Sequence, residues 1–321
     1  MDIPLDVLNI MASYITKNRM KLLDWVGVNI NRLPKAFISQ NPNAIDLLET
    51  HKNKINYDSI AVNINAIHLI EDKIIAEKIP NKYELAILAG NRNPMILLEA
   101  EINKIEWSDL SRNPNAIHIL EANPDKIVWK ELSSNPNAIK LLEANPDKIH
   151  WDELSANPNA ISLLEANPKK INWQYLSTNP NAIHLLEVNL DKIELGWRCW
   201  MLLSGNPNAI HILESNPDKI DWRSLSENPN AIHLLEANPD KINWRYLSKN
   251  PNAIHLLEAN LNKIDWEWLA DNPNAMHLLK TKQKKIDWLR LAVNPSIFEP
   301  NTKLINENIL NKAIILDKII N

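Results

Sequence analysis

Histidines recur along this chain at a spacing that could bring metal ligands together. Seven of the nine occupy one place in a repeated phrase: His68, His118, His184, His211, His233, His255 and His277. If successive copies stack about 10 Å apart, as packed helices do, two imidazole rings could bridge a metal ion. A straight line of histidines cannot supply the four ligands of a tetrahedral zinc site. Asp46, Lys140 and Ser162 also occupy this place, so it does not require imidazole. The pattern favours a solvated helix face, and we expect no metal and no cofactor.

Glutamate and lysine form two further periodic sets, which run from Glu49 to Glu258 and from Lys54 to Lys285. Pairing between such exposed sets would contribute at most about 1 kcal/mol per pair. Catalysis needs unlike groups that converge on one point, whereas a periodic chain presents the same groups in every copy. The single cysteine, Cys199, has no base near it in the sequence and excludes a disulfide framework. We therefore predict a protein that is not an enzyme.

Composition excludes several other classes. The 35 Lys and Arg residues nearly balance the 39 Asp and Glu residues, so the net charge of −4 gives no attraction to nucleic acid or anionic membrane. No apolar run is long enough to span a bilayer, and the apolar stretch at the N-terminus is too short for a signal peptide. We expect an intracellular protein without a membrane partner. The 20 prolines and 12 tryptophans, against 4 glycines, point to an unusual architecture.

An internal repeat explains this composition and sets the elements that carry the periodic residues. The phrase Asn-Pro-Asn-Ala-Ile, or a decayed form of it, begins at Asn41, Asn63, Asn91, Asn113, Asn135, Asn157, Asn179, Asn206, Asn228, Asn250, Asn272 and Asn294. Most starts lie 22 residues apart, and two longer gaps of 28 and 27 residues carry insertions. We number the unit as slots 1 to 22, with the consensus N-P-N-A-I-H-L-L-E-A-N-P-D-K-I-x-W-x-x-L-S-x. A fixed period of this length indicates a solenoid or another repeat array.

Each unit has the pattern of two short helices. Asn at slot 1 suits a helix N-cap and Pro at slot 2 suits the first helical position, so a helix of about 9 residues is predicted from there. Asn and Pro at slots 11 and 12 end it, and Asp or Asn at slot 16 is a second N-cap. Helices this short are marginal alone, so the units must stack on one another.

The tryptophans mark the predicted core. Trp at slot 17 and Leu at slot 20 share a helix face, which favours a buried ladder of rings over an exposed groove. A leucine-rich horseshoe is the alternative, but it needs apolar residues where slots 18 and 3 are polar. The predicted fold is all-α, an α-solenoid superhelix of about twelve 22-residue units, each with one α-helix and one short α or 3₁₀ helix.

The phrase L-S-x-N-P-N-A-I-x-L-L-E-x-N-P-D-K-I resembles the short Asn-Pro repeats of proteins from giant DNA viruses that infect amoebae. It is also similar in rhythm to leucine-rich-repeat variant solenoids, which alternate an α-helix with a 3₁₀ helix. The resemblance covers residues 41–298 and implies a right-handed superhelix of short helices. It says nothing about activity. A viral origin would imply the host cytoplasm or the virion as the location.

The two ends depart from the repeat. Residues 1–40 are predicted to be an N-terminal cap, residues 41–299 the solenoid, and residues 300–321 a C-terminal amphipathic capping helix, with an oligomerisation helix as the alternative. The segment from Ile3 to Ile15 resembles the opening of an F-box, although Ala12 departs from that pattern and the second half of an F-box is not evident. This resemblance implies docking on a Skp1-like adaptor through Val7, Leu8 and Met11.

The residues at slots 18 and 19 change in every unit, whereas most other slots keep the consensus. Helical repeat proteins present a binding surface through such variable positions. Tyr, Trp and Arg, which are common at protein interfaces, occur at these slots and in the second insertion. This insertion lies between Asn179 and Asn206 and adds Trp197 and Arg198. The candidate partner-binding residues are Tyr175, Trp197, Arg198, Arg223, Arg245, Tyr246 and Trp268. Simple drift at solvated positions is the alternative explanation for the variation.

These patterns favour a non-enzymatic protein–protein interaction solenoid, a scaffold or adaptor, which would be a viral adaptor to a host ubiquitin ligase if the F-box resemblance holds. The alternatives are a structural virion or assembly component and a repeat-based nucleic-acid binder, of which the last is disfavoured by the balanced charge. The sequence does not identify the protein partner.

Overall fold

The computed structural model describes residues 19–60, 63, 65–66, 69, 106–193 and 196–306. Within these ranges the chain is the predicted all-α repeat solenoid, with its strands confined to one short pair. Val7, Leu8, Met11 and most of the predicted C-terminal helix lie outside the described residues.

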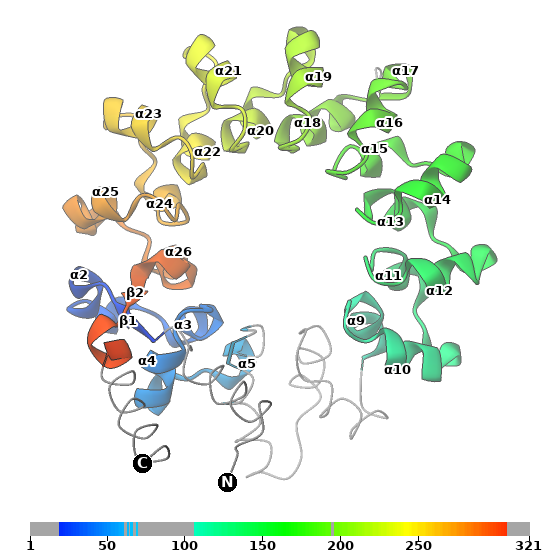
Figure 1. The fold of residues 1–321 in the computed structure, drawn as a ribbon. Coiled ribbons are helices and arrows are strands. Elements are labelled where there is room, and N and C mark those ends of the chain that lie inside the picture. Colours follow the sequence, from blue (N-terminus) through cyan, green and yellow to red (C-terminus); the bar gives the residue numbers. More distant parts are fainter. Residues whose placement is uncertain are drawn as a thin grey trace, which may run out of the picture.

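The units stack side by side so that their helices form two rows, which curve together into an arc (Figure 1). The inner row carries the Trp-x-x-Leu-Ser segments. Its helices are α9 (Trp107–Arg112), α11 (Trp129–Ser133), α13 (Trp151–Ala156), α15 (Trp173–Leu176), α18 (Trp197–Gly205), α20 (Trp222–Glu227), α22 (Trp244–Lys249), α24 (Trp266–Leu269) and α26 (Trp288–Val293).

The outer row carries the Ile-His-Leu-Leu-Glu segments. Its helices are α10 (Ile117–Ala122), α12 (Ile139–Glu143), α14 (Ile161–Ala166), α16 (Ile183–Glu187), α19 (Ile210–Ser215), α21 (Ile232–Ala237), α23 (Ile254–Ala259) and α25 (Met276–Thr281). In several units a 3₁₀ helix links the outer helix to the next inner helix. These are η4 (Pro124–Lys126), η5 (Pro146–Lys148), η6 (Pro168–Lys170), η7 (Pro217–Lys219) and η8 (Gln283–Lys285). In the second insertion α17 (Leu190–Ile193) takes this place.

Asn-Pro pairs end both kinds of helix. A residue before proline is held in an extended conformation, so Asn157 at slot 1 has φ −74° and ψ 117° and stops α13. Asn167 at slot 11 stops α14 with a different backbone conformation, φ −133° and ψ 56°, and the following Pro168 opens η6. The predicted N-caps at slot 16 are confirmed where Asn or Asp is present, as at Asp221, whose Oδ1 accepts the Ser224 N–H at 2.7 Å.

The predicted role of Asn at slot 1 is wrong in one respect. The outer helix begins at slot 5, for example at Ile139, and Pro and Asn at slots 2 and 3 form a turn before it. The Oδ1 of Asn135 accepts the N–H of Asn137 at 3.0 Å and so caps that turn rather than the helix. The helix is therefore shorter than predicted, because the turn uses its first residues.

Buried asparagines tie each unit to the one before it. The Nδ2 of Asn157 donates to the carbonyl oxygens of Ser133 and Asn135, both at 3.0 Å, and Asn157 is 1% exposed. The same pair of bonds recurs at Asn63, Asn135, Asn179, Asn206, Asn228, Asn250 and Asn272. Ser at slot 21 adds a second link, since the Ser133 hydroxyl accepts the N–H of His150 at 2.9 Å. A buried polar side chain is stable here because each of these groups has a partner.

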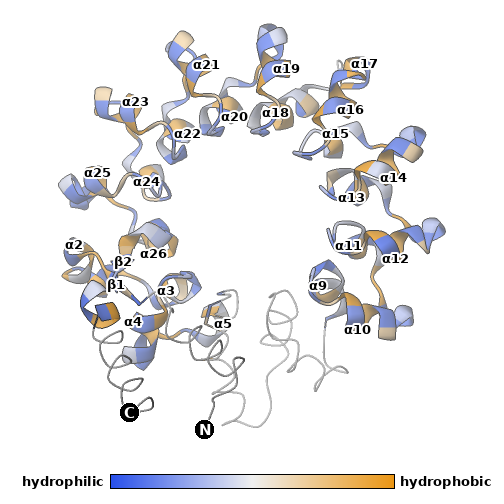
Figure 2. Ribbon diagram, in the orientation of Figure 1, coloured by the Kyte–Doolittle hydropathy of each residue, from blue (hydrophilic) through white to orange (hydrophobic). Residues whose placement is uncertain are grey.

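The hydrophobic core lies between the two rows and runs the length of the arc. Ala at slot 4, Leu at slot 8 and Leu at slot 20 are fully buried in unit after unit, as in Ala160, Leu164 and Leu154. Figure 2 shows hydrophobic residues recurring where the rows meet. The predicted buried ladder of tryptophans is confirmed in part: Trp200, Trp266 and Trp288 are buried, whereas the other tryptophans at slot 17 are half-buried and pack against the core.

The N-terminal segment does not lie at the far end of the solenoid from the C-terminus. It contains β1 (Met20–Leu22), α2 (Asp24–Gly27), η1 (Ile30–Arg32), α3 (Lys35–Gln40), α4 (Ile45–Thr50), η2 (Lys52–Lys54) and α5 (Tyr57–Ile60). After α26 the chain forms η9 (Pro295–Ile297) and β2 (Phe298–Pro300). β1 and β2 pair antiparallel, with Lys21 opposite Glu299, and α3 packs on α26 (Figure 1). The described units therefore follow one another from α9 to α26 and continue through α3 to α5.

This closing contact has the geometry of an ordinary contact between units. The Nδ2 of Asn41 donates to the carbonyl oxygens of Ala292 and Asn294, both at 2.9 Å, and the Nδ2 of Asn43 donates to the Pro295 oxygen at 3.0 Å. These bonds match those between successive units, although about 250 residues separate the partners. The end surface beyond α26 is thus covered by the chain's own N-terminal segment.

No helix in the described ranges combines the length and the apolar character that a bilayer crossing requires.

Candidate functional site

Slot 19 of the inner row forms a continuous line of side chains, which we call the inner stripe. From α9 to α3 its members are Asp109, Glu131, Glu153, Tyr175, Leu202, Ser224, Tyr246, Trp268, Arg290 and Phe37. The first three are acidic, whereas from α15 onward most are aromatic, apolar or cationic. Tyr175 and Phe37 are 36% and 37% exposed. The stripe continues across the closing contact, because α3 follows α26 in the stack.

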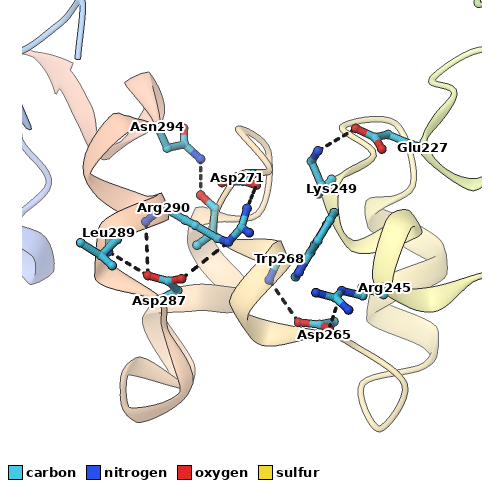
Figure 3. Close-up of polar contacts among 11 residues, drawn as sticks. Glu227, Arg245, Lys249, Asp265, Trp268, Asp271, Asp287, Leu289, Arg290 and Asn294 are labelled. Carbon is cyan, nitrogen blue, oxygen red and sulfur yellow. Dashed lines mark hydrogen bonds and ion pairs between the residues drawn. The ribbon is translucent and has the colours of Figure 1, made fainter. Parts of the chain in front are cut away.

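A cluster of aromatic rings and cations lies along the second part of the stripe, and Figure 3 shows its tryptophan, Trp268, with the surrounding cations. The rings of Tyr246 and Trp268 have centroids 5.2 Å apart. The guanidinium of Arg245 lies 4.4 Å from the Trp268 centroid, that of Arg290 lies 4.8 Å away, and the Lys249 ammonium lies 5.1 Å away. Each cation is attracted to the negative face of the indole, by about 0.5–1 kcal/mol at an exposed site.

Carboxylates hold these cations in place. Arg290 pairs with Asp271 at 2.7 Å and with Asp287 at 3.6 Å, and the Lys249 Nζ pairs with Glu227 at 2.7 Å (Figure 3). All of these side chains are partly exposed, so each pair contributes at most about 1 kcal/mol. Their effect is positional, since they fix the charged groups around Trp268.

Arg223 extends the cluster onto α20. Its guanidinium lies 4.6 Å from the centroid of the Tyr246 ring, and it also donates to the Tyr246 hydroxyl. The structure thus brings together four of the residues proposed from the sequence, Arg223, Arg245, Tyr246 and Trp268, on three adjacent inner helices.

The remaining candidates do not join this cluster. Tyr175 lies on α15 of the same stripe. Trp197 and Arg198 begin α18 and are exposed, with 73% of Trp197 accessible. The described part of the chain gives them no contact with the rings on α22 and α24.

Sequence reasoning missed Lys249 and Phe37 and did not propose Arg290 as a site residue. Lys249 occupies slot 22, which varies as much as slots 18 and 19, so the same argument from variation could have found it. Phe37 precedes the first clear unit and reaches the stripe only through the closing contact. No local signal in the sequence marks it.

The acidic part of the stripe is internally paired. Glu131 forms an ion pair with Arg112, and Glu153 pairs with Lys130 at 3.7 Å. Burial raises the pKa of Asp109, although the nearby Arg112 acts in the opposite direction. This part of the inner row carries no aromatic side chain in slot 18 or slot 19.

The periodic histidines and lysines have structural partners. Histidines at slot 6 contact Glu at slot 9 of the preceding unit, as His255 does with Glu236 at 2.8 Å. Some lysines at slot 14 cover the slot 17 ring of the preceding unit, as Lys263 does at 4.6 Å from the Trp244 centroid; the others that do so are Lys170, Lys241 and Lys285. Lys126, Lys148, Lys192 and Lys219 instead pair with the Asp that precedes them. The exposed Glu set therefore pairs with histidine rather than with lysine. Among the described residues no group of three or more His, Cys, Asp or Glu side chains is arranged to hold a metal ion.

The second insertion buries the only cysteine. Cys199 lies in the first turn of α18 and is 7% exposed. Burial raises the pKa of its thiol, while a hydrogen bond with the Ser177 side chain lowers it less. Neutral thiols are poor nucleophiles, so this environment is not that of a catalytic cysteine.

In comparisons with known proteins, no family model, no curated protein and no solved structure matches this chain.

Proposed function

We propose that this chain is a non-enzymatic protein-binding solenoid, a scaffold or adaptor, whose partner lies along the inner stripe between α15 and α3. The observation that carries the proposal is the cluster of Tyr246 and Trp268 with the guanidinium groups of Arg223, Arg245 and Arg290. Tyr, Trp and Arg are the residue types that dominate the energetics of protein interfaces.

The repeat suits a binding role because the positions that hold the units together are not the positions that vary. Slots 1, 4, 8, 20 and 21 are buried and link the units, whereas slots 18, 19 and 22 differ from unit to unit. A change at a variable slot alters the surface without changing the stack, which is how repeat proteins acquire binding specificity.

The location of the binding surface is tested by photo-crosslinking in extracts of the native host cell. A photoreactive amino acid at Leu289, which is 47% exposed at slot 18 of α26, should crosslink to a discrete partner. The matched control is the same amino acid at Ala237, which is exposed on the outer helix α21. Equal crosslinking from both positions, or crosslinking from Ala237 alone, would place the partner elsewhere.

The contribution of the cluster is tested with the captured partner. If Trp268 is a hot spot of the interface, its truncation costs at least about 2 kcal/mol, so Trp268→Ala should weaken the affinity about thirtyfold. Lys126→Ala, at an exposed lysine of η4, should leave the affinity unchanged. A Trp268→Ala variant that binds as tightly as the parent protein would refute the assignment of the cluster.

An adaptor role would add a second contact through the F-box-like segment at Ile3–Ile15, which lies outside the described residues. The tagged chain should then capture a Skp1-like protein, and Val7→Asp combined with Leu8→Asp should abolish the capture. Absence of capture by the unsubstituted chain removes the ligase version and leaves the inner-stripe proposal intact.

A single-stranded nucleic acid is the alternative partner, because alternating rings and cations also suit stacked bases. The carboxylates that pair with Arg290 and Lys249 argue against it, since they would repel phosphates. Gel-shift assays at low salt should show no complex with single-stranded DNA or RNA.

A further inference from the structure

A groove of about 610 Å³ lies on the inner row where α18, α20 and α22 meet. Its floor and walls combine apolar, polar and charged side chains. The members that bear on its chemistry are Met201, Leu202, Gly205, Arg223, Glu227 and Tyr246. The groove adjoins the aromatic cluster, because Arg223 and Tyr246 belong to both.

The two charged side chains of this groove differ in their state of pairing. Glu227 is neutralised by Lys249, whose Nζ lies 2.7 Å from its carboxylate. Arg223 lies over the ring of Tyr246 and donates to its hydroxyl, and within the described part of the chain no carboxylate forms an ion pair with it. The groove therefore carries one uncompensated positive charge.

Stacking leaves that guanidinium ready for an acid. An arginine that lies over an aromatic ring keeps N–H donors along its edge, and these match the two oxygens of a carboxylate. Contacts with the ring and hydroxyl of Tyr246 restrict the exposed guanidinium before a ligand binds, which lowers the entropy that binding must overcome. Met201 and Leu202 are half-buried beside it and offer apolar surface.

Gly205 leaves room for the ligand. It occupies slot 22, where other units carry Arg112, Thr178, Lys249 or Asp271. A Cβ built on Gly205 would meet only the Cβ of Ser224, at 3.9 Å, which is an ordinary contact. A Cβ is therefore tolerated at Gly205, and a larger side chain there would occupy part of the groove that Gly205 lines.

We propose that this groove binds an acidic segment of a partner polypeptide, with a Glu or Asp side chain on Arg223 and a neighbouring apolar side chain on Met201 and Leu202. The inference rests on the proposed function and specifies the chemistry of the partner. The acidic side chain of the partner would neutralise Arg223, and its apolar side chain would cover Met201 and Leu202.

The test uses the full chain and a fluorescent peptide that alternates glutamate and leucine, with anisotropy as the readout. The same peptide with glutamine or lysine in place of glutamate provides the comparison. We expect the glutamate peptide to bind at least about tenfold more tightly than the glutamine peptide, to lose affinity as salt rises, and the lysine peptide not to bind.

Two substitutions locate the binding. Arg223→Gln removes the charge, and Gly205→Tyr fills the groove; each should weaken binding of the glutamate peptide at least about tenfold. Lys130→Gln, at the same slot as Arg223 but on α11, is the matched control and should bind normally. Circular dichroism and a thermal melt establish that each variant folds.

Three results would overturn the proposal. These are absence of binding up to about 1 mM glutamate peptide, equal binding of the glutamate and lysine peptides, and tighter binding of a single-stranded RNA than of the glutamate peptide. Crosslinking from Leu289 does not depend on acidic chemistry. A partner captured there without any binding of the glutamate peptide would refute the ligand class alone, whereas failure of that crosslink would refute the proposed function.

Discussion

The asparagine at slot 1 shows how one side chain can hold a repeat together. Its Nδ2 reaches two carbonyl oxygens of the preceding segment, and its Oδ1 caps the turn that follows, so every polar atom of a buried amide has a partner. Loss of the Asn157 side chain would leave the buried carbonyl of Ser133 without its donor, although the Asn135 oxygen keeps the N–H of Ala138 at 3.1 Å. An unpaired buried group costs more than an exposed bond contributes.

Asn157→Ala should therefore lower the free energy of unfolding by about 2 kcal/mol, measured by urea denaturation. Asn159→Ala is the matched control, since Asn159 is exposed and its Nδ2 makes one bond, to the Pro136 oxygen at 2.9 Å. It should cost less than about 1 kcal/mol. Equal losses for both variants would contradict the bridging role of slot 1.

Cys199 should react slowly with alkylating agents at neutral pH, because burial raises the pKa of its thiol and keeps the proton on sulfur. The folded chain then retains this proton at pH values where the unfolded chain has lost it. The contribution of Cys199 to stability is therefore complete below the ordinary thiol pKa and declines as the pH rises above it. Iodoacetamide rates across this range, with and without denaturant, measure the effect. A native rate equal to the denatured rate at neutral pH would refute it.

The elements of this fold are short because Asn-Pro pairs interrupt them, so each depends on its neighbours for stability. The one long inner helix, α18, is built differently. It begins three residues before the slot 17 ring of Trp200, and its first turn closes against Gly196. A Cβ on Gly196 would approach the Sγ of Cys199 to 2.8 Å, closer than packed atoms allow.

Gly196→Ala should accordingly destabilise the chain by about 1–2 kcal/mol in the same denaturation assay. Because the next nearest atoms to this Cβ lie at 3.5 Å or more, Cys199→Ala should remove the clash. In the double variant Gly196→Ala should then cost much less than it costs alone, which a double-mutant cycle measures. Strict additivity would show that the loss has another origin.

At the scale of the whole molecule, closure of the array is the property that distinguishes this solenoid from an open stack. Two buried residues, Ile297 and Phe298, belong to the closing contact: the Ile297 oxygen accepts the Leu23 N–H at 2.9 Å, and Phe298 lies opposite Leu22 in the β1–β2 pair. The Trp25 and Trp288 rings meet at 6.4 Å, and the Arg32 guanidinium lies 4.5 Å from the Trp288 centroid. Repeat arrays derive their stability from contacts between neighbouring units, so this contact stabilises both ends.

Ile297→Asp should open the array, because it puts a charge in a fully buried position of the closing contact. Small-angle X-ray scattering should show a larger radius of gyration, while circular dichroism should show most helices retained, since units far from the contact keep their neighbours. Glu299→Gln is the control, because it removes only the exposed pair with Lys21. An unchanged radius for a folded Ile297→Asp variant would refute closure in solution.

The sequence by itself determined the period, the helical class, the buried slots and the tryptophan ladder, because these depend on contacts that repeat within a few tens of residues. It also pointed to Arg223, Arg245, Tyr246 and Trp268 through variation at slots 18 and 19. Only the tertiary structure decided that Asn at slot 1 links units, that Glu pairs with His while some of the lysines cover Trp, and that Phe37 joins the inner stripe. These facts depend on which side chains meet between stacked units, or on a contact between Asn41 and Asn294. The curvature of the whole array sets that contact, and no single unit encodes it.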